Sequence, residues 1–328
     1  MIIKLKWVVI AEAIAILILA AVLINSYLAE SKSDKLRNSG FLSQRIYAGL
    51  LEPKSFLITN FMPLKENIHN YIDKNNLNVS VYVENLRNGA FMGIDEKNGF
   101  FPASLNKLPV AILIMKKIEQ GDMSLDTMLE IKDIDKTDSS GELYKTKEKK
   151  LPVGILLEKL LKDSDNTALR VLLRSVDLED LQLILDYYGI DINVDYQGVQ
   201  RAKNPDLITP KAMSNLISSL YFSTVLDAES SEYLLKLLSE SNFNIKEIAN
   251  LPDGVKVAHK FGDNYYGNNR FFHDCGIMYI GETRVLYCIM TKNLDEGAAE
   301  ETVGVILNQI YNYITSTKSK LEKYQKKT

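Results

Sequence analysis

The sequence contains few of the residues that metal and redox sites usually need. Its 328 residues include only three histidines, two cysteines and one tryptophan. His69, His259 and His273 form no pair with the spacing of metal ligands. A G-x-S-x-G sequence is also absent, which argues against a serine–histidine triad on a strand-to-helix turn. We therefore expect no metal ion and no cofactor.

A strong bias of charge is missing as well. The net charge is −3 and 25% of the residues are charged, so the composition does not indicate nucleic acid as a partner. Apolar residues make up 46% of the chain, which is enough to bury one large core or two small ones. The sequence has no internal repeat and no low-complexity segment. We expect a monomer that binds no nucleic acid.

An apolar run near the N-terminus is long enough to cross a membrane. Lys4 and Lys6 precede Trp7 to Ile24, which is apolar apart from Glu12. As a helix, this run would extend about 27 Å, close to the roughly 30 Å of a hydrocarbon core. Lysines followed by an apolar run are typical of a signal sequence or signal anchor. We expect a single-pass membrane protein whose body lies outside the cytoplasm.

The rest of the chain divides by composition. Residues 29–31 are a poor cleavage site, which favours an anchor over residues 1–30 that is not removed. A polar stalk is expected over residues 31–60, a globular domain over 61–316 and a basic tail over 317–328.

The apolar periodicity of the body predicts two strands, a helical block, three further strands and a last helix. Helices are expected over residues 63–75, 102–121, 152–176 with a break at 163–166, 178–189, 209–222, 229–241 and 298–314, and strands over residues 77–86, 90–95, 254–262, 271–280 and 283–292. This order predicts an α+β fold in which early and late strands form one antiparallel sheet with helices packed around it.

The two cysteines flank a predicted hairpin. If Gly281 and Glu282 form its two-residue loop, Ile280 faces Thr283, and the same register places Cys275 opposite Cys288. Outside the cytoplasm these cysteines could form a cross-strand disulfide. Two buried free thiols on one face are the alternative.

Ser104 is the only serine in the chain with a lysine three residues later. On a helix, Lys107 would lie one turn from Ser104 on the same face, within a stretch that is apolar nearly all round. Burial disfavours the charged amine and would let a neutral lysine act as base toward the serine. The alternative is that Ser104 caps a helix and Lys107 points into water.

Two further motifs carry polar side chains that suit catalysis. Ser164-Asp165-Asn166 occurs once and lies between helical stretches, where it could relay a proton and hold a substrate amide, or only cap the next helix. Lys260-Phe261-Gly262 ends a predicted strand, so that Lys260 supplies positive charge and Gly262 permits a close approach of substrate backbone. His259, next to Lys260, either tunes that lysine or has a structural role.

The order and spacing of the three motifs resemble those of the class A β-lactamases and related penicillin-recognising serine enzymes. Sixty residues separate Ser104 from Ser164, and 96 separate Ser164 from Lys260. The flanking sequences "FPASLNKLPVA", "MSLDTMLEIKD", "LLEKLLKDSDNTAL" and "ITPKAMSNL" resemble the family as well. The likeness extends from about Val79 to Ile314.

This resemblance implies a role for each residue. Ser104 would be the nucleophile and Lys107 its base, while Ser164 would pass a proton to the leaving nitrogen. Asn166 would bind the amide of the substrate side chain, and Lys260 would stabilise negative charge near Ser164 and the substrate carboxylate. The remaining implied contacts are Gly262, for close approach of the substrate, and an oxyanion hole from the backbone N–H groups of Ser104 and Asp263.

Two departures from the family pattern bear on the reaction. The stretch "IDINVDYQGVQRAKNPDLI" holds no E-x-x-L-N motif, and Asp191, Asp195 and Asp206 are its only acidic residues. An acyl-enzyme should therefore form but clear slowly, unless Asp195 or a relayed water substitutes. Phe261 occupies the position at which the family usually has a hydroxyl group that binds the substrate carboxylate.

We therefore expect a membrane-anchored serine hydrolase of the class A β-lactamase type that opens an amide through a Ser104 acyl-enzyme. Its partner would be a small-molecule β-lactam or a cell-wall peptide. The alternatives are a penicillin-binding D-alanyl peptidase and a non-catalytic relative that only binds peptidoglycan.

Overall fold

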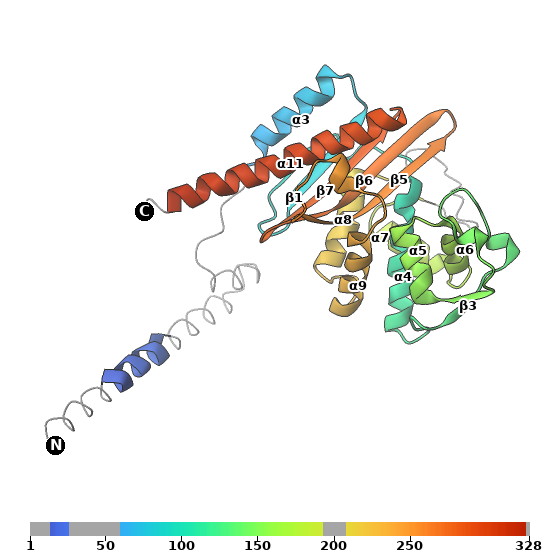
Figure 1. The fold of residues 1–328 in the computed structure, drawn as a ribbon, viewed down its shortest axis with the longest axis horizontal. Coiled ribbons are helices and arrows are strands. Elements are labelled where there is room, and N and C mark those ends of the chain that lie inside the picture. Colours follow the sequence, from blue (N-terminus) through green and yellow to red (C-terminus); the bar gives the residue numbers. More distant parts are fainter. Residues whose placement is uncertain (1–13, 26–59, 193–207, 326–328) are drawn as a thin grey trace. The chain divides into compact units, whose positions relative to one another are not determined.

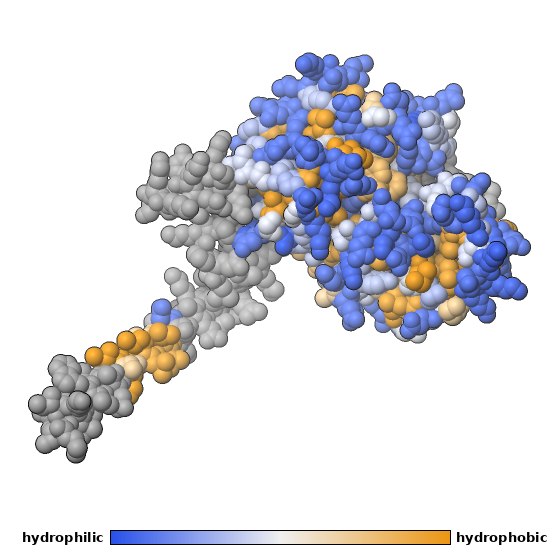
Figure 2. Space-filling model, in the orientation of Figure 1, coloured by the Kyte–Doolittle hydropathy of each residue, from blue (hydrophilic) through white to orange (hydrophobic). Residues whose placement is uncertain are grey.

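The structure is a computed structural model that describes residues 14–25, 60–192 and 208–325, with side chains to residue 317. The chain divides into two units, Met1–Ile58 and Thr59–Thr328. In the first unit, residues 14–25 form a helix whose large apolar side chains are exposed (Figure 2). None of the helices in the described ranges combines the length and apolarity that a membrane span requires. The predicted anchor and stalk lie mostly outside the described residues, so the anchor remains a prediction from sequence.

The second unit is built on a five-stranded antiparallel sheet with the order β2-β1-β7-β6-β5 (Figure 1). Its strands are β1 (Val79–Asn85), β2 (Phe91–Ile94), β5 (Lys256–Tyr266), β6 (Asn269–Ile280) and β7 (Thr283–Lys292). The predicted α+β fold and the pairing of early with late strands, here β1 with β7, are confirmed.

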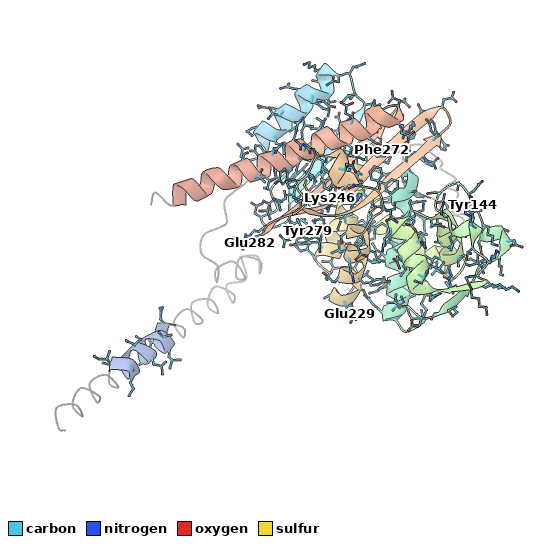
Figure 3. The ribbon with its side chains drawn as sticks, viewed as in Figure 1. Tyr144, Glu229, Lys246, Phe272, Tyr279 and Glu282 are labelled. Carbon is cyan, nitrogen blue, oxygen red and sulfur yellow. A yellow bond between two sulfur atoms is a disulfide. The ribbon has the colours of Figure 1, made fainter. Side chains whose placement is uncertain are left out.

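Helices cover both faces of this sheet. On one face, α3 (Met62–Lys74), α10 (Ile245–Ile248) and α11 (Glu296–Gln325) enclose an apolar core. The other face packs against the inserted helical block, whose members are α4 (Lys107–Glu119), α5 (Val153–Lys162), α6 (Asn166–Leu173), α7 (Leu178–Tyr187), α8 (Pro210–Tyr221) and α9 (Ala228–Ser239). Figure 3 shows Phe272 on the α11 side and Tyr144 within the helical block. The sheet therefore separates two apolar cores.

The hairpin between β6 and β7 has the predicted register. Ile280 faces Thr283, and Cys275 faces Cys288. The two cysteines are buried and form a disulfide, so the alternative of two free thiols is wrong. The turn residue Gly281 has φ of 57°, a left-handed conformation that glycine adopts at little cost.

Three local features differ from the sequence expectation. The last helix was expected to end at Ile314, where the apolar stripe ends, but α11 continues to Gln325. Lysine, glutamate, leucine and glutamine favour helix there, and neither glycine nor proline interrupts it. A short pair of strands, β3 (Met128–Glu130) with β4 (Lys150–Pro152), was not predicted. The stretch before Lys107 is a 3-10 helix, Ala103–Asn106, that continues into α4.

Candidate active site

Ser104 lies in the 3-10 helix that leads from the sheet into α4. A 3-10 helix has three residues per turn, so side chains at positions i and i+3 are eclipsed and Lys107 stands directly over Ser104. Lys107 Nζ lies 2.9 Å from Ser104 Oγ. The preceding residue, Ala103, has φ of 47°, a left-handed conformation that costs a non-glycine residue about 1–3 kcal/mol. This strained turn places the Ser104 hydroxyl in the pocket described below.

Lys107 is buried, with 1% of its surface exposed, although it carries an amine. Besides Ser104 Oγ, its Nζ contacts Ser164 O at 2.5 Å and Ser164 Oγ at 3.0 Å. Burial lowers the pKa of Lys107 well below its usual range, and the charge of Lys260 lowers it further, against the opposing effect of Asp165. As an ammonium, Lys107 donates to all three oxygens; once neutral, its two hydrogens can stay on Ser164 while its lone pair accepts from Ser104.

Ser164 is the point where the two buried lysines meet. Its Oγ accepts from Lys107 Nζ and from Lys260 Nζ, each at 3.0 Å. With both lone pairs engaged, the Ser164 hydroxyl hydrogen is left to donate into the pocket. The residue has φ of 54°, so a second strained position lies at the site.

Lys260 comes from β5 and is 1% exposed. Its Nζ contacts Ser164 Oγ at 3.0 Å and Phe261 O at 2.7 Å, and it lies 4.3 Å from the centroid of the Phe261 ring. Burial lowers the pKa of Lys260 to about 7, while the negative charge of Asp274 opposes that shift. The site therefore holds two buried amines, and burial lowers the pKa of both.

The Ser164-Asp165-Asn166 motif caps a helix and also contributes two residues to the lining of the pocket. Asp165 caps α6 by accepting from the backbone N–H of Ala168 at 2.9 Å. Asn166 lines the pocket and donates from Nδ2 to Ser139 Oγ at 2.8 Å. Its carboxamide oxygen is thus free of that contact and available to a ligand amide. The cap holds Ser164 and Asn166 on either side of a fixed helix start.

Gly262 permits the close approach of β5 to Ser104. A Cβ there would lie 3.0 Å from the backbone nitrogen of Ser104 and 3.2 Å from Cβ of Ala103. Any larger residue would move these groups apart. The next residue, Asp263, also lines the pocket, and its carboxylate pairs with Arg270 at 2.7 Å.

These residues surround a pocket of about 580 Å³. Four of the predicted residues line it directly: Ser104, Ser164, Asn166 and Asp263. Lys107, Lys260 and Gly262 lie beneath them, buried. The geometry brings all seven sequence-predicted residues together.

Several residues of the site were missed from the sequence. Ser140 Oγ donates to Ser164 O at 2.9 Å, and Ser139 holds Asn166. Phe101 and Tyr266 stack at 5.0 Å on the rim of the pocket. The serine pair in "DSSGEL" and the aromatics in "GFFPAS" were the only local signals, and neither reveals a partner distant in sequence.

The histidines near the site bind other protein groups. His273 Nε2 donates to the carbonyl of Phe101 at 2.8 Å, and burial lowers the pKa of His273 to about 4, so the ring is neutral. His259 Nδ1 contacts Asp274 Oδ2 at 2.7 Å, and Tyr287 donates to Asp274 Oδ1 at 2.6 Å. These contacts fit the structural role considered for His259. Asp274 had no sequence signal.

The stretch expected to supply a deacylating base is mostly outside the described residues. Asp195 and Asp206 fall in residues 193–207, and Asp191, which is described, is exposed and does not line the pocket. Among the described residues that line the pocket, Asp263 is the only one with a carboxylate, and it is ion-paired.

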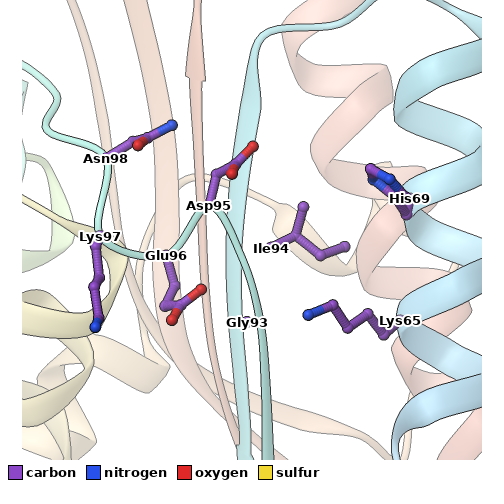
Figure 4. A pocket seen from close by; sticks show the side chains of 8 residues that line it. All are labelled: Lys65, His69, Gly93, Ile94, Asp95, Glu96, Lys97 and Asn98. Carbon is purple, nitrogen blue, oxygen red and sulfur yellow. The ribbon is translucent and has the colours of Figure 1, made fainter.

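A second pocket lies between α3 and the end of β2 and has no catalytic grouping (Figure 4). It is lined by Lys65, His69, Gly93, Ile94, Asp95, Glu96, Lys97 and Asn98, so it contains no hydroxyl or thiol nucleophile. Lys97-Asn98-Gly99, the second K-x-G triplet of the chain, lies at this pocket rather than beside Ser104. Within the described ranges, acidic, histidine and cysteine side chains form no group of three or more that could hold a metal.

Comparisons with known proteins agree with this geometry. A family model described as "Beta-lactamase enzyme family" matches residues 63–314. Among curated proteins, the chain is 23% identical to beta-lactamase VEB-1 of Pseudomonas aeruginosa over 235 residues, which cover 67% of this chain and 79% of the relative.

Two solved structures illustrate the similarity of fold. The TLA-1 extended spectrum beta-lactamase matches with a TM-score of 0.71 and 21% identity, covering 78% of this chain and 99% of its own. PBP-A matches with a TM-score of 0.68 and 19% identity, covering 78% of this chain and 97% of its own.

Proposed function

The chain belongs to the beta-lactamase enzyme family of hydrolases, and on that premise we propose that it opens amide bonds of β-lactams through an acyl-enzyme on Ser104. The observation that carries this proposal is the contact between a buried amine and one hydroxyl, Lys107 Nζ to Ser104 Oγ at 2.9 Å. The arrangement of the motifs favours a hydrolase of the class A β-lactamase type.

Acylation starts with a proton transfer. As Ser104 Oγ attacks the carbonyl carbon, its proton passes to neutral Lys107, which burial keeps uncharged. The carbonyl oxygen gains negative charge and is stabilised by the backbone N–H groups of Ser104 and Asp263. Each such donor is typically worth about 2.7–4 kcal/mol of the barrier.

The C–N bond breaks when the leaving nitrogen receives a proton. Ser164 donates it, since its Oγ already accepts from both lysines and its own hydrogen points to the pocket. Protonated Lys107, 3.0 Å away, returns a proton to Ser164 Oγ and is neutral again. Positive Lys260 stabilises the charge that develops on Ser164 during the transfer.

The direct test is intact-protein mass spectrometry after incubation with penicillin. We expect the mass to rise by that of one whole penicillin, because opening the ring releases no fragment. Ser104→Ala should show no increase. If the wild type neither gains mass nor hydrolyses the penicillin while a folded chain is seen by circular dichroism, or if Ser104→Ala gains the same mass, the proposal is wrong and the non-catalytic binding protein is favoured.

A second candidate is a penicillin-binding peptidase that acts on D-alanyl cell-wall peptides. The observation favouring it is that Asp263, the only carboxylate on the described lining of the pocket, is ion-paired and so poorly suited to activate a water. A solved structure of a PBP-A variant is itself an acyl-enzyme complex with penicillin G. A penicillin adduct that persists for hours would favour the peptidase, and rapid turnover of a chromogenic cephalosporin would favour the β-lactamase.

Membrane attachment is part of the proposal. The support is the sequence alone, with Lys4 and Lys6 followed by the apolar run from Trp7 to Ile24. The body would then lie outside the cytoplasm, where the Cys275–Cys288 disulfide is stable. The full chain should stay with membranes in alkaline carbonate, and a chain lacking residues 1–30 should be released.

A further inference from the structure

The pocket has a side that would contact the substituent on the leaving nitrogen. In the proposed reaction, Ser164 Oγ protonates that nitrogen, so whatever the nitrogen carries lies beside Ser164. Lys260 Nζ is 3.0 Å from the same oxygen, and Phe261 follows Lys260 on β5 and lines the pocket. A negatively charged substituent would need a donor or cation at this place.

Lys260 has no hydrogen left for such a substituent. Its ammonium has three, and three directions are occupied by protein: Ser164 Oγ, the carbonyl of Phe261 at 2.7 Å, and the Phe261 ring at 4.3 Å. Its 1% exposure also leaves almost no surface on which a ligand could approach.

The Phe261 ring is held where it is. It stacks on Phe243 with a centroid distance of 4.5 Å and an interplanar angle of 23°. Phe243 in turn packs 5.8 Å from Phe272 and 6.3 Å from His259. Moving the Phe261 ring aside would break up this aromatic cluster, so the ring is a fixed wall of the pocket.

The charged group of the pocket lining beside this wall is a carboxylate, and it is ion-paired. Asp263 lies two residues beyond Phe261 and lines the pocket, and its pairing with Arg270 engages the cation nearest to it. Arg170, the cation among the described residues that line the pocket, lies on α6 one helical turn after Asn166.

We propose that Phe261 makes the enzyme selective for substrates whose leaving nitrogen carries an uncharged, apolar or aromatic substituent rather than a carboxylate. The inference rests on the proposed acylation of Ser104. An aromatic face offers such a group a dry contact, whereas a carboxylate placed there loses water and gains no hydrogen bond.

The test compares a penicillin with its methyl ester, which differ only in the charge of the carboxyl group on the leaving side. The acylation rate of Ser104 is followed by mass spectrometry for both. For the wild type we expect the ester to react at least as fast as the acid. Phe261→Thr should shift the acid-to-ester rate ratio at least about tenfold toward the acid, since a hydroxyl replaces the ring.

The matched control is Phe91→Thr, the same change at an exposed phenylalanine on β2, at the other edge of the sheet. It should leave the ratio unchanged. If Phe261→Thr does not fold, the acid-to-ester rate ratio of the wild type is sufficient to test the inference. A wild type that prefers the acid by tenfold or more overturns the inference and leaves the proposed function intact, as does a ratio that Phe261→Thr does not move. Failure of both compounds to acylate Ser104 overturns the proposed function itself.

Discussion

The two faces of the central sheet bury ionisable groups in opposite ways. On the face toward the helical block, none of the carboxylates in the described ranges lies within hydrogen-bond distance of Lys107 or Lys260, and the pKa of each lysine is lowered by burial. On the face toward α10 and α11, the Asp274 carboxylate is buried but receives hydrogen bonds from His259 and Tyr287. Burial is common to both faces, so the lack of a compensating charge is what distinguishes the reactive one.

This difference follows from what each arrangement costs. A buried charge with full hydrogen bonding adds specificity and little reactivity, whereas an uncompensated buried amine loses its proton and becomes a base. Within the described ranges, the candidate site is marked by two buried cationic side chains without a carboxylate partner. Four changes test this comparison, from the largest expected effect to the smallest.

Lys107→Met should have the largest effect. Without its general base, acylation of Ser104 by penicillin should slow by about 10²–10⁴-fold. The thermal midpoint should rise, because an apolar chain replaces a buried amine and Ser164 O keeps its bond from Ser140. Labelling kinetics and thermal melting measure both. Lys117→Met, at a lysine paired with Asp180 on the surface, is the control and should change neither. A stable variant with wild-type rate would show that the buried amine is not the base.

Gly262→Ala should slow acylation about tenfold. The new Cβ would lie 3.0 Å from the Ser104 nitrogen, so the segment that carries the nucleophile must shift by a few tenths of an ångström. Gly267→Ala, in the β5–β6 turn with open space around its Cα, is the control for the substitution type. Its φ of 59° makes it costly for stability, so only the labelling rates of the folded proteins are compared. Equal rates would contradict the close approach.

Asp274→Asn tests whether the faces are independent. Lys260 acts as a cation, so acylation should decline as pH rises through its pKa of about 7. The negative charge of Asp274 raises the pKa of Lys260 from the other face of the sheet. Removing that charge should lower the pKa of Lys260, so that the acylation rate declines at a lower pH. Rate profiles over about pH 5.5 to 9 measure this decline. If the acylation rate of a folded variant declines at the same pH as in the wild type, the charge of Asp274 does not affect Lys260 across the sheet.

Tyr287→Phe should have the smallest effect on chemistry. It removes one hydrogen bond to Asp274 but keeps the carboxylate charge. The acylation rate, and the pH at which this rate declines, should therefore stay as in the wild type. The free energy of unfolding should fall by about 1–3 kcal/mol, since a buried acceptor loses a partner. Urea denaturation measures this. A changed acylation rate would show that the α11 face takes part in catalysis.

The sequence was sufficient for features with a local or ordered signal. Alternating apolar residues gave the five strands of the main sheet, and the Gly281-Glu282 turn gave the β6–β7 register. The three motifs gave six of the seven site residues, and the family resemblance gave Asp263. Pairings between distant residues had no such signal. Ser139 with Asn166, His273 with the Phe101 carbonyl, and His259 with Asp274 depend on how the sheet and the helical block pack.

The pairing of β1 with β7 has a consequence for how activity arises during folding. It joins Val79 to Thr291 across more than two hundred residues, and Ser104, Ser164 and Lys260 come from three separate parts of the intervening chain. Folds that pair residues so distant in sequence form slowly, because the entropy cost of closing a long loop comes before the favourable contacts form. During refolding, the rate at which the chain becomes able to react with penicillin would therefore report when the tertiary structure is complete. No part of the chain that folds early contains all three groups.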